Sequence, residues 1–175
     1  SSIKFALDTN YAMAIIAIVF AAILDTLDGR VARLIKGTSK IGKELDSLTD
    51  VISFGVAPGF IIYFWTLNEI GKFGWMFVLI YTVCCALRLA RFNLMITEEN
   101  ETWKINFFEG VPSPAAAGLV LLPLILSLSG IVQFENYTVL SSTAILTTSI
   151  LMVSKIPTYS LKRILIPRHL AIFLL

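Results

Sequence analysis

Four of the five aspartates in this 175-residue chain fall between positions 25 and 50. They form two close pairs, Asp25 with Asp28 and Asp46 with Asp50. Each pair lies at the end of an apolar stretch, where a charged side chain is costly and is therefore a candidate for a functional role. Like charges repel unless a cation lies among them, so these carboxylates predict a metal site.

Helix geometry places the members of each pair on one face. The members of the first pair are about 60° apart and those of the second about 40° apart. Small residues, Gly29 among them, flank Asp25 and leave room for a bulky group to approach. Arg33 lies two turns further on, near the same face, and suits bidentate binding of phosphate. We expect Gly37 and Gly42 to bend the chain into a hairpin that brings the pairs together.

The residue types indicate which chemistry such a site would perform. Four carboxylates without a sulfur or histidine partner are typical of a hard cation such as Mg²⁺, Mn²⁺ or Ca²⁺. A metal beside an arginine and a small-residue notch predicts a diphosphate site suited to phosphoryl transfer. A carboxylate not fully occupied by metal would act as general base toward an alcohol. The alternative is a set of salt bridges at helix ends, but these would not need small residues at fixed offsets.

The composition is that of a membrane protein. Hydrophobic residues make up 57% of the chain and charged residues 15%, whereas soluble domains carry roughly 25% charged residues. Uncharged stretches predict five spans, and the first three must include part of their charged flanks to reach the about 20 residues that a bilayer requires. The stretches are residues 9–24, 51–68, 73–87, 111–134 and 136–154, and a sixth begins near Ile164. We expect an all-α polytopic transmembrane helix bundle, a single catalytic domain over residues 1–175, trimmed at both ends.

The positive charges predict the orientation in the membrane. With five spans, twelve lysines and arginines fall on one side and two, Lys4 and Lys72, on the other. Because cytoplasmic loops carry the excess of positive charge, we expect the aspartates at the cytoplasmic face of an integral multi-pass protein. The longest loop, residues 97–110, is on the same side, and its acidic run is expected to be solvated. An ion or proton transporter is the alternative from another class, but it requires carboxylates near the midplane.

The aspartates belong to one motif, which reads Asp25-x-x-Asp28-Gly29-x-x-Ala32-Arg33, eight further residues, and Gly42-x-x-x-Asp46-x-x-x-Asp50. This spacing resembles the full signature of the CDP-alcohol phosphotransferases. The flanking segments look like the membrane-bound phosphatidylserine synthase branch of that family. They are ELDSLTDVISFGVAP, ALRLARFN, GVPSPAAAG and SKIPTYSLK.

The resemblance implies a helical membrane enzyme, usually a homodimer, that displaces CMP from a CDP-linked lipid with an alcohol. In the branch that the chain resembles, the donor is CDP-diacylglycerol, the acceptor is L-serine, and the products are phosphatidylserine and CMP. Inositol phosphate or glycerol phosphate as acceptor, or an archaeal ether-lipid donor, would be alternatives within the same chemistry. The expected partners are membrane lipids and a small alcohol, with no nucleic acid.

The resemblance also implies roles for single residues. The four aspartates would bind two divalent cations, Mg²⁺ or Mn²⁺, and Asp50 would deprotonate the acceptor hydroxyl. Gly29 and Arg33 would contact the nucleotide and its phosphates, and Ser39 would touch the CDP group. The family normally has a complete helix before the one that carries the first aspartates. Only residues 1–8 precede that helix here, so we expect some nucleotide contacts to be missing from this chain.

The carboxylate of a serine acceptor requires a cation near the metal site. The candidate cations are Arg88, Arg91, Lys155 and Lys162, and the candidate hydrogen-bonding residues are Asn93 and Ser113. For the basic residues among them, the alternative is anchoring to lipid headgroups. Pro58, Pro112 and Pro114 are expected to shape helix ends and kinks rather than to touch substrate.

Overall fold

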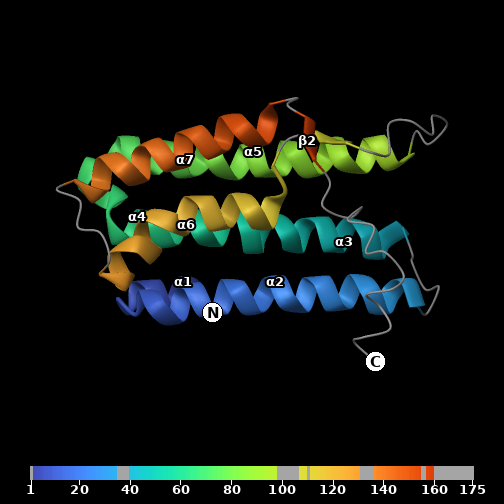
Figure 1. Ribbon diagram of the computed structural model, residues 1–175, viewed down its shortest axis with the longest axis horizontal. Helices are drawn as coiled ribbons and strands as arrows, with labels where there is room; N and C mark the ends of the chain where they lie inside the picture. The colour runs from blue at the N-terminus through green and yellow to red at the C-terminus, as the bar shows by residue number, and fades with distance from the viewer. Residues whose placement is uncertain are drawn as a thin grey trace, which may run out of the picture.

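The computed structural model describes residues 2–34, 40–97, 107–109, 111–130, 136–154 and 157–159 (Figure 1). Some of these are described by their backbone alone, namely residues 28–34, 40, 43, 92, 94–97, 107–109 and 157–159. The helical segments are α1 (Ser2–Leu7), α2 (Tyr11–Leu34), α3 (Lys40–Asp50), η1 (Val51–Val56), α4 (Ala57–Trp65), η2 (Leu67–Ile70), α5 (Lys72–Thr97), α6 (Ser113–Ser129) and α7 (Tyr137–Val153). Two short strands are β1 (Phe107–Glu109) and β2 (Pro157–Tyr159).

Each of the five stretches predicted as spans is largely helical in the described residues, and the exceptions are short turns or ends such as Thr9, Asn10 and Thr66. The first is α2, which continues past both aspartates of the first pair, and the second is divided among η1, α4 and the start of η2, with α3 directly before it. The third is α5, which extends well beyond its predicted end at residue 87. Gly42 lies inside α3, so the expectation that it bends the chain was wrong. Gly37, the acidic run after Thr97 and the sixth stretch lie outside the described residues.

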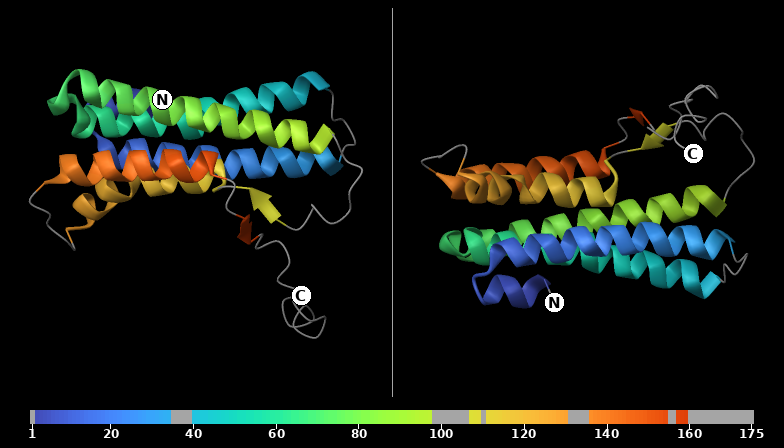
Figure 2. Two further views of the ribbon diagram at one scale, coloured as in Figure 1. Left: turned by 90° about the horizontal axis from the view of Figure 1, so that it is seen from above. Right: turned by 60° about the horizontal axis from the view of Figure 1, so that its bottom comes forward.

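The long helices lie side by side, with their axes along the longest dimension of the molecule (Figure 1, Figure 2). The helix α7 packs against α5 and α6, whereas α4 packs against α1, α5 and α6. The helix α6 begins and α7 ends part-way along the molecule, so α2, α3 and α5 extend beyond them at one end. We call residues 25–34, 40–50 and 88–97 the projecting end. It contains the residues of both aspartate pairs.

The core consists of aliphatic side chains contributed by several helices. Ile61 and Ile62 of α4, Val120 and Leu124 of α6, and Ile145 of α7 are at most 1% exposed. In lipid, helix association depends on close packing of such surfaces, because lipid tails are as apolar as the side chains themselves. The position of each helix is therefore determined by the fit between neighbouring surfaces.

Two glycines allow η1 and α4 to approach α5 closely. A Cβ atom added at Gly55 would lie 3.1 Å from the Cβ of Cys85, and one added at Gly59 would lie 3.0 Å from Cγ1 of Val78. Gly55 and Gly59 form a Gly-x-x-x-Gly pattern, which is typical of closely packed membrane helices. This contact holds the segment that follows Asp50 against α5.

The outer surface of the helices is also apolar. Ile16, Phe20 and Ile23 of α2, with Phe73 and Val83 of α5, are between 51% and 62% exposed. An apolar exterior around an apolar core favours a lipid environment. In the described part of the chain, Glu44–Trp65 and Lys72–Arg91 are long and apolar enough to cross a membrane, by length and composition. Tyr11–Leu27, α6 and α7 are shorter apolar helices.

The strand pair is a departure from the all-α prediction. The strands β1 and β2 pair antiparallel, with Phe107 opposite Tyr159 and Glu109 opposite Pro157. Each strand has three residues, which is too short for an alternating pattern to be recognised in the sequence. The pair joins the chain before α6 to the chain after α7.

Gly59→Leu is expected to destabilise the protein, because the new side chain would press on the stiff, branched side chain of Val78. Overpacking of this kind costs about 1–3 kcal/mol. Thermal unfolding in detergent, followed by circular dichroism, measures the loss. Gly118→Leu in α6 is the matched control, because an added Cβ there meets nothing within 4 Å. Equal losses in the two variants would contradict close packing at Gly59.

Candidate functional site

Two of the four motif aspartates, Asp25 and Asp50, meet at the base of the projecting end. The carboxyl groups of Asp25, on α2, and Asp50, at the end of α3, share a hydrogen bond. The charge of Asp46 also acts on Asp50. Asp25 and Asp50 are partly buried, whereas Asp46 is exposed. The side chain of Asp28 lies outside the described set, and the catalytic and metal-binding roles of all four stay predictions.

The chemistry of this cluster fits a divalent cation. A hydrogen bond between two carboxyl groups requires a shared proton, because two carboxylates side by side repel each other. The Oδ1 atom of Asp50 is buried and has no hydrogen-bond partner among the described residues, which is costly. A cation in place of the proton would satisfy this oxygen, and an all-oxygen donor set suits Mg²⁺ or Mn²⁺.

The described side chains do not form a complete set of metal ligands. Among them, no three acidic, histidine or cysteine residues are placed to hold an ion together. By its position in the motif, Asp28 is the expected additional ligand, and its side chain is among those not described. The structure therefore supports the donor chemistry of the predicted site without testing its coordination.

Arg88 connects the carboxylates to the start of α6. Its charge acts on Asp50, and its Nη1 donates a hydrogen bond of 2.8 Å to Oγ of Ser113. Ser113 is only 1% exposed, and Nε of Arg88 is buried without a partner among the described residues. Arg88 therefore faces the carboxylates, and of its two predicted roles this position favours the acceptor site over a lipid anchor.

Arg91 and Asn93 connect α5 to its neighbours. Arg91 is exposed, and its Nη1 donates to the carbonyl oxygen of Val153 in α7 at 2.9 Å. Nδ2 of Asn93 donates to Oγ of Ser47 in α3 at 2.8 Å. These bonds hold helices in place, so both residues have a structural role that the sequence did not predict.

The remaining predicted site residues lie outside the described side chains. Gly29 and Arg33 are on α2, the helix that carries Asp25, but only their backbone is described. Ser39, Lys155 and Lys162 are not described at all. Their predicted contacts are therefore untested.

The segment directly after Asp50 is a π-helix, which the sequence reading missed. The N–H of Ala57 donates to the carbonyl of Ile52, five residues earlier, where an α-helix would use the residue four earlier. Single π-helical turns of this kind are frequent at functional sites. The available signal was Pro58, in the first turn of α4. It was expected to shape a helix, as it does here.

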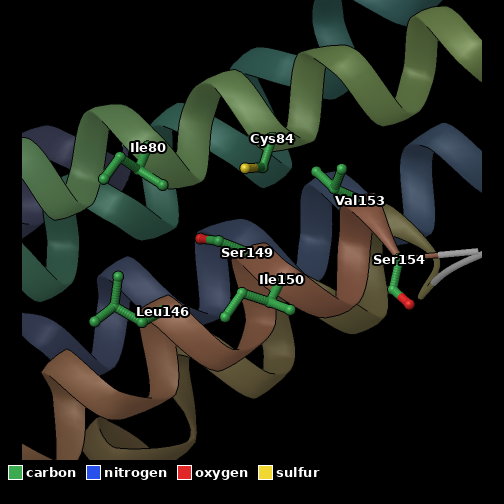
Figure 3. Close-up of a pocket in the computed structure, with 7 residues that line it drawn as sticks. All are labelled: Ile80, Cys84, Leu146, Ser149, Ile150, Val153 and Ser154. Carbon is green, nitrogen blue, oxygen red and sulfur yellow. The ribbon is translucent and has the colours of Figure 1, made fainter.

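A separate pocket of about 460 Å³ lies between α5 and α7 (Figure 3). Ile80 and Cys84 of α5 face α7 across it. The residues that line it from the other side are Leu146, Ser149, Ile150, Val153 and Ser154. None of these side chains is charged, so the pocket offers neither the carboxylates nor the cation that the motif supplies.

The profile of the CDP-alcohol phosphatidyltransferases matches residues 1–159. The chain belongs to this family. The family predicted from the aspartate motif is thereby confirmed. The aspartates of that motif include Asp25 and Asp50, whose carboxyl groups meet beside Arg88 in the fold.

Relatives in this family come from distant organisms. A protein of Mycobacterium leprae is 40% identical over 172 residues, which cover 98% of this chain and 57% of the relative. A protein of Helicobacter pylori is 46% identical over 125 residues, which cover 71% of this chain and 51% of the relative. A protein of Methanocaldococcus jannaschii is 36% identical over 139 residues, which cover 79% of this chain and 60% of the relative. Each is named CDP-diacylglycerol–serine O-phosphatidyltransferase. The chain spans less than two thirds of the length of these relatives.

Mn²⁺ is expected to raise the unfolding temperature, because an ion that binds only the folded carboxylates stabilises the fold. At 100 times its dissociation constant, the ion would add about 2.7 kcal/mol. Asp50→Asn should remove most of this gain. Asp8→Asn, which changes the one aspartate outside the motif, should leave it intact. Thermal unfolding with Mn²⁺ and with EDTA measures both, and a full gain in Asp50→Asn would contradict a cation site there.

Proposed function

We propose that the chain forms the catalytic core of a CDP-diacylglycerol–serine O-phosphatidyltransferase built as a transmembrane helix bundle. The observation that carries the proposal is the meeting of Asp25 with Asp50 beside Arg88, because these carboxylates belong to the family motif. The relatives named for this reaction support serine as the acceptor. Their range from bacteria to an archaeon leaves the tails of the lipid donor open.

The proposed reaction is a direct displacement at phosphorus. Asp50 accepts the proton of the serine hydroxyl, and the serine oxygen attacks the phosphorus that bears the diacylglycerol. The bond between that phosphorus and the bridging oxygen breaks, so CMP leaves with the bridging oxygen and phosphatidylserine forms. The four motif aspartates would hold two divalent cations, Mg²⁺ or Mn²⁺, whose charge would stabilise the diphosphate and the leaving group. Gly29, Arg33 and Ser39 would bind the nucleotide and its phosphates.

Arg88 is the strongest candidate for binding the acceptor. It is partly buried, bonded to Ser113 and close to Asp50, so a serine carboxylate held there would place its hydroxyl near the proposed base. Arg91 and Asn93 already bond to neighbouring helices, which favours a structural role for them. Lys155 and Lys162 remain candidates from the sequence.

The projecting end suits a reaction between a lipid and a water-soluble alcohol. Asp46 is exposed there while Asp25 and Asp50 are partly buried, so the site has one side toward water. The apolar outer surfaces of α2 and α5 would keep the lipid donor alongside. We place this end at the cytoplasmic face from the distribution of positive charge, and we propose a homodimer, as is usual in the family.

An acceptor screen tests the proposed reaction. The full-length protein in detergent, supplied with CDP-diacylglycerol and Mn²⁺ or Mg²⁺, is expected to release CMP with serine but not with inositol phosphate or glycerol phosphate. CMP is measured by liquid chromatography. CMP release with inositol phosphate or glycerol phosphate but not with serine would show that serine is not the acceptor, while the reaction would still be that of a CDP-alcohol phosphotransferase. Ion flux through liposomes without CMP release would revive the transporter alternative.

Asp50→Asn is expected to abolish serine-dependent CMP release, because the amide can neither accept the proton nor offer a charged oxygen to a cation. Loss of a general base alone typically costs about 10²–10⁴-fold. Asp8→Asn is the control and should retain activity. Circular dichroism of both variants checks that the helices are intact. Retained activity in Asp50→Asn would mean that another group is the base, with Asp46 the first to examine.

A further inference from the structure

The π-helical turn η1 lies between the carboxylates and the core. Asp46 and Asp50 are on α3, directly before the turn, and α4 follows it with Ile61 and Ile62 fully buried. The core contacts therefore determine the orientation of α4, and the turn determines how α3 is rotated relative to α4. An inserted residue rotates a helix by about 100°. In a continuous α-helix, the same carboxylates would point in another direction.

The chemistry of Pro58 explains why the helix changes its bonding here. In an α-helix the carbonyl of Phe54 would accept the N–H of residue 58, four positions later. Residue 58 is proline, which has no N–H and whose ring clashes with that carbonyl. A wider turn relieves the clash, but it leaves the carbonyl of Phe54 without its α-helical donor.

Tyr81 provides a donor for this carbonyl from another helix. Its hydroxyl donates to the carbonyl oxygen of Phe54 at 2.7 Å, and Tyr81 and Phe54 are at most 1% exposed. A buried hydroxyl without a partner would be costly, so the position of this hydroxyl is closely linked to the backbone of the turn. Phenylalanine would fill the same space without this bond.

One face of α5 contacts the π-helical turn and the start of α4 at successive positions. Val78 lies against Gly59, Cys85 lies against Gly55, and Tyr81 between them bonds to Phe54. One turn after Cys85 on the same face, Arg88 acts on Asp50. A single helix therefore contacts both the turn and the carboxylate whose direction the turn determines.

We propose that Tyr81 is a positioning residue: its bond to Phe54, together with Pro58, fixes the π-helical turn and thereby directs Asp46 and Asp50 toward Asp25 and Arg88. Tyr81 acts through the backbone of the turn and need not touch substrate. The inference rests on the proposed cation site and reaction, and it adds a residue that their motif does not contain.

Tyr81→Phe tests the inference by removing only the hydroxyl. Mn²⁺ binding in detergent is measured by the loss of the free-ion signal in electron paramagnetic resonance, and CMP release gives kcat and KM. Changing a group that orients a metal ligand typically costs about 10- to 100-fold. We expect Mn²⁺ affinity and kcat to fall by at least tenfold, with a smaller change in KM for serine.

Tyr11→Phe is the matched control. The hydroxyl of Tyr11 also donates to a carbonyl of α4, that of Phe64 at 3.3 Å, but at the end of α4 away from the carboxylates. We expect Mn²⁺ affinity and kcat to be unchanged in this variant. Equal losses of Mn²⁺ affinity in the two variants would overturn the inference, because they would reflect general loosening of α4.

Pro58→Ala provides a second test that does not depend on Tyr81. Alanine restores the N–H that an α-helix needs, so we expect the unfolding temperature to stay the same or rise while Mn²⁺ affinity falls. Pro123→Ala, which changes a buried proline inside α6, should not weaken Mn²⁺ binding. If Tyr81→Phe does not fold, the Mn²⁺ affinities of Pro58→Ala and Pro123→Ala decide whether the π-helical turn orients the carboxylates.

The readouts separate this inference from the proposed function. Wild-type Mn²⁺ affinity in both Tyr81→Phe and Pro58→Ala would overturn the inference, whatever the enzyme makes. Absence of CMP release from the wild-type protein would overturn the proposed reaction, while the Mn²⁺ titrations would still decide the role of the turn. Absence of Mn²⁺ binding in the wild-type protein would overturn both the cation site and the inference.

Discussion

The repulsion between Asp25 and Asp50 is the constraint on which the rest of the structure depends. Two carboxyl groups side by side and partly out of water are stable only if a proton or a cation lies between them. In this fold the two carboxyl groups lie within hydrogen-bonding distance of each other, with Arg88 close by. Such an arrangement persists only if the helices on both sides resist separation. The Gly-x-x-x-Gly contact of Gly55 and Gly59 holds the segment after Asp50 against α5, and α2, which carries Asp25, packs on η1 and α4.

Much of the site was predictable because its signals are local. Aspartates at helical spacing beside a glycine and an arginine predict one shared face, and the apolar stretches around them predict helices. That reasoning, with a hairpin expected at Gly37 and Gly42, predicted that the two pairs lie close together, although Gly42 lies inside α3 and does not bend the chain. It also assigned the chain to the family that the profile confirms. It could not decide whether Arg88 binds the acceptor or anchors to lipid headgroups, because the burial of Arg88 against Ser113 depends on how α5 lies relative to α6.

The parts that escaped prediction depend on contacts between distant residues. The bond from Tyr81 to Phe54 joins residues 27 positions apart, and a tyrosine in an apolar stretch gives no sign of its partner. The π-helix has only Pro58 as a local signal, and the donor to the carbonyl of Phe54 comes from α5. Likewise, β1 and β2 pair although α6 and α7 lie between them in the sequence. Each strand has only three residues, which are too few to show the alternation of apolar and polar residues that marks a strand. In each case the deciding partner lies on another segment.

The strand pair has a mechanical consequence for the helices that it brackets. With β1 before α6 and β2 after α7, the pairing closes these two helices and their connection into a ring of chain. The two helices are therefore tied to each other through the strand pair as well as along their packed faces. Ser113 at the start of α6 holds Arg88, and Val153 at the end of α7 holds Arg91. The hydrogen bonds of Arg88 and Arg91 thus fasten both ends of this ring to α5.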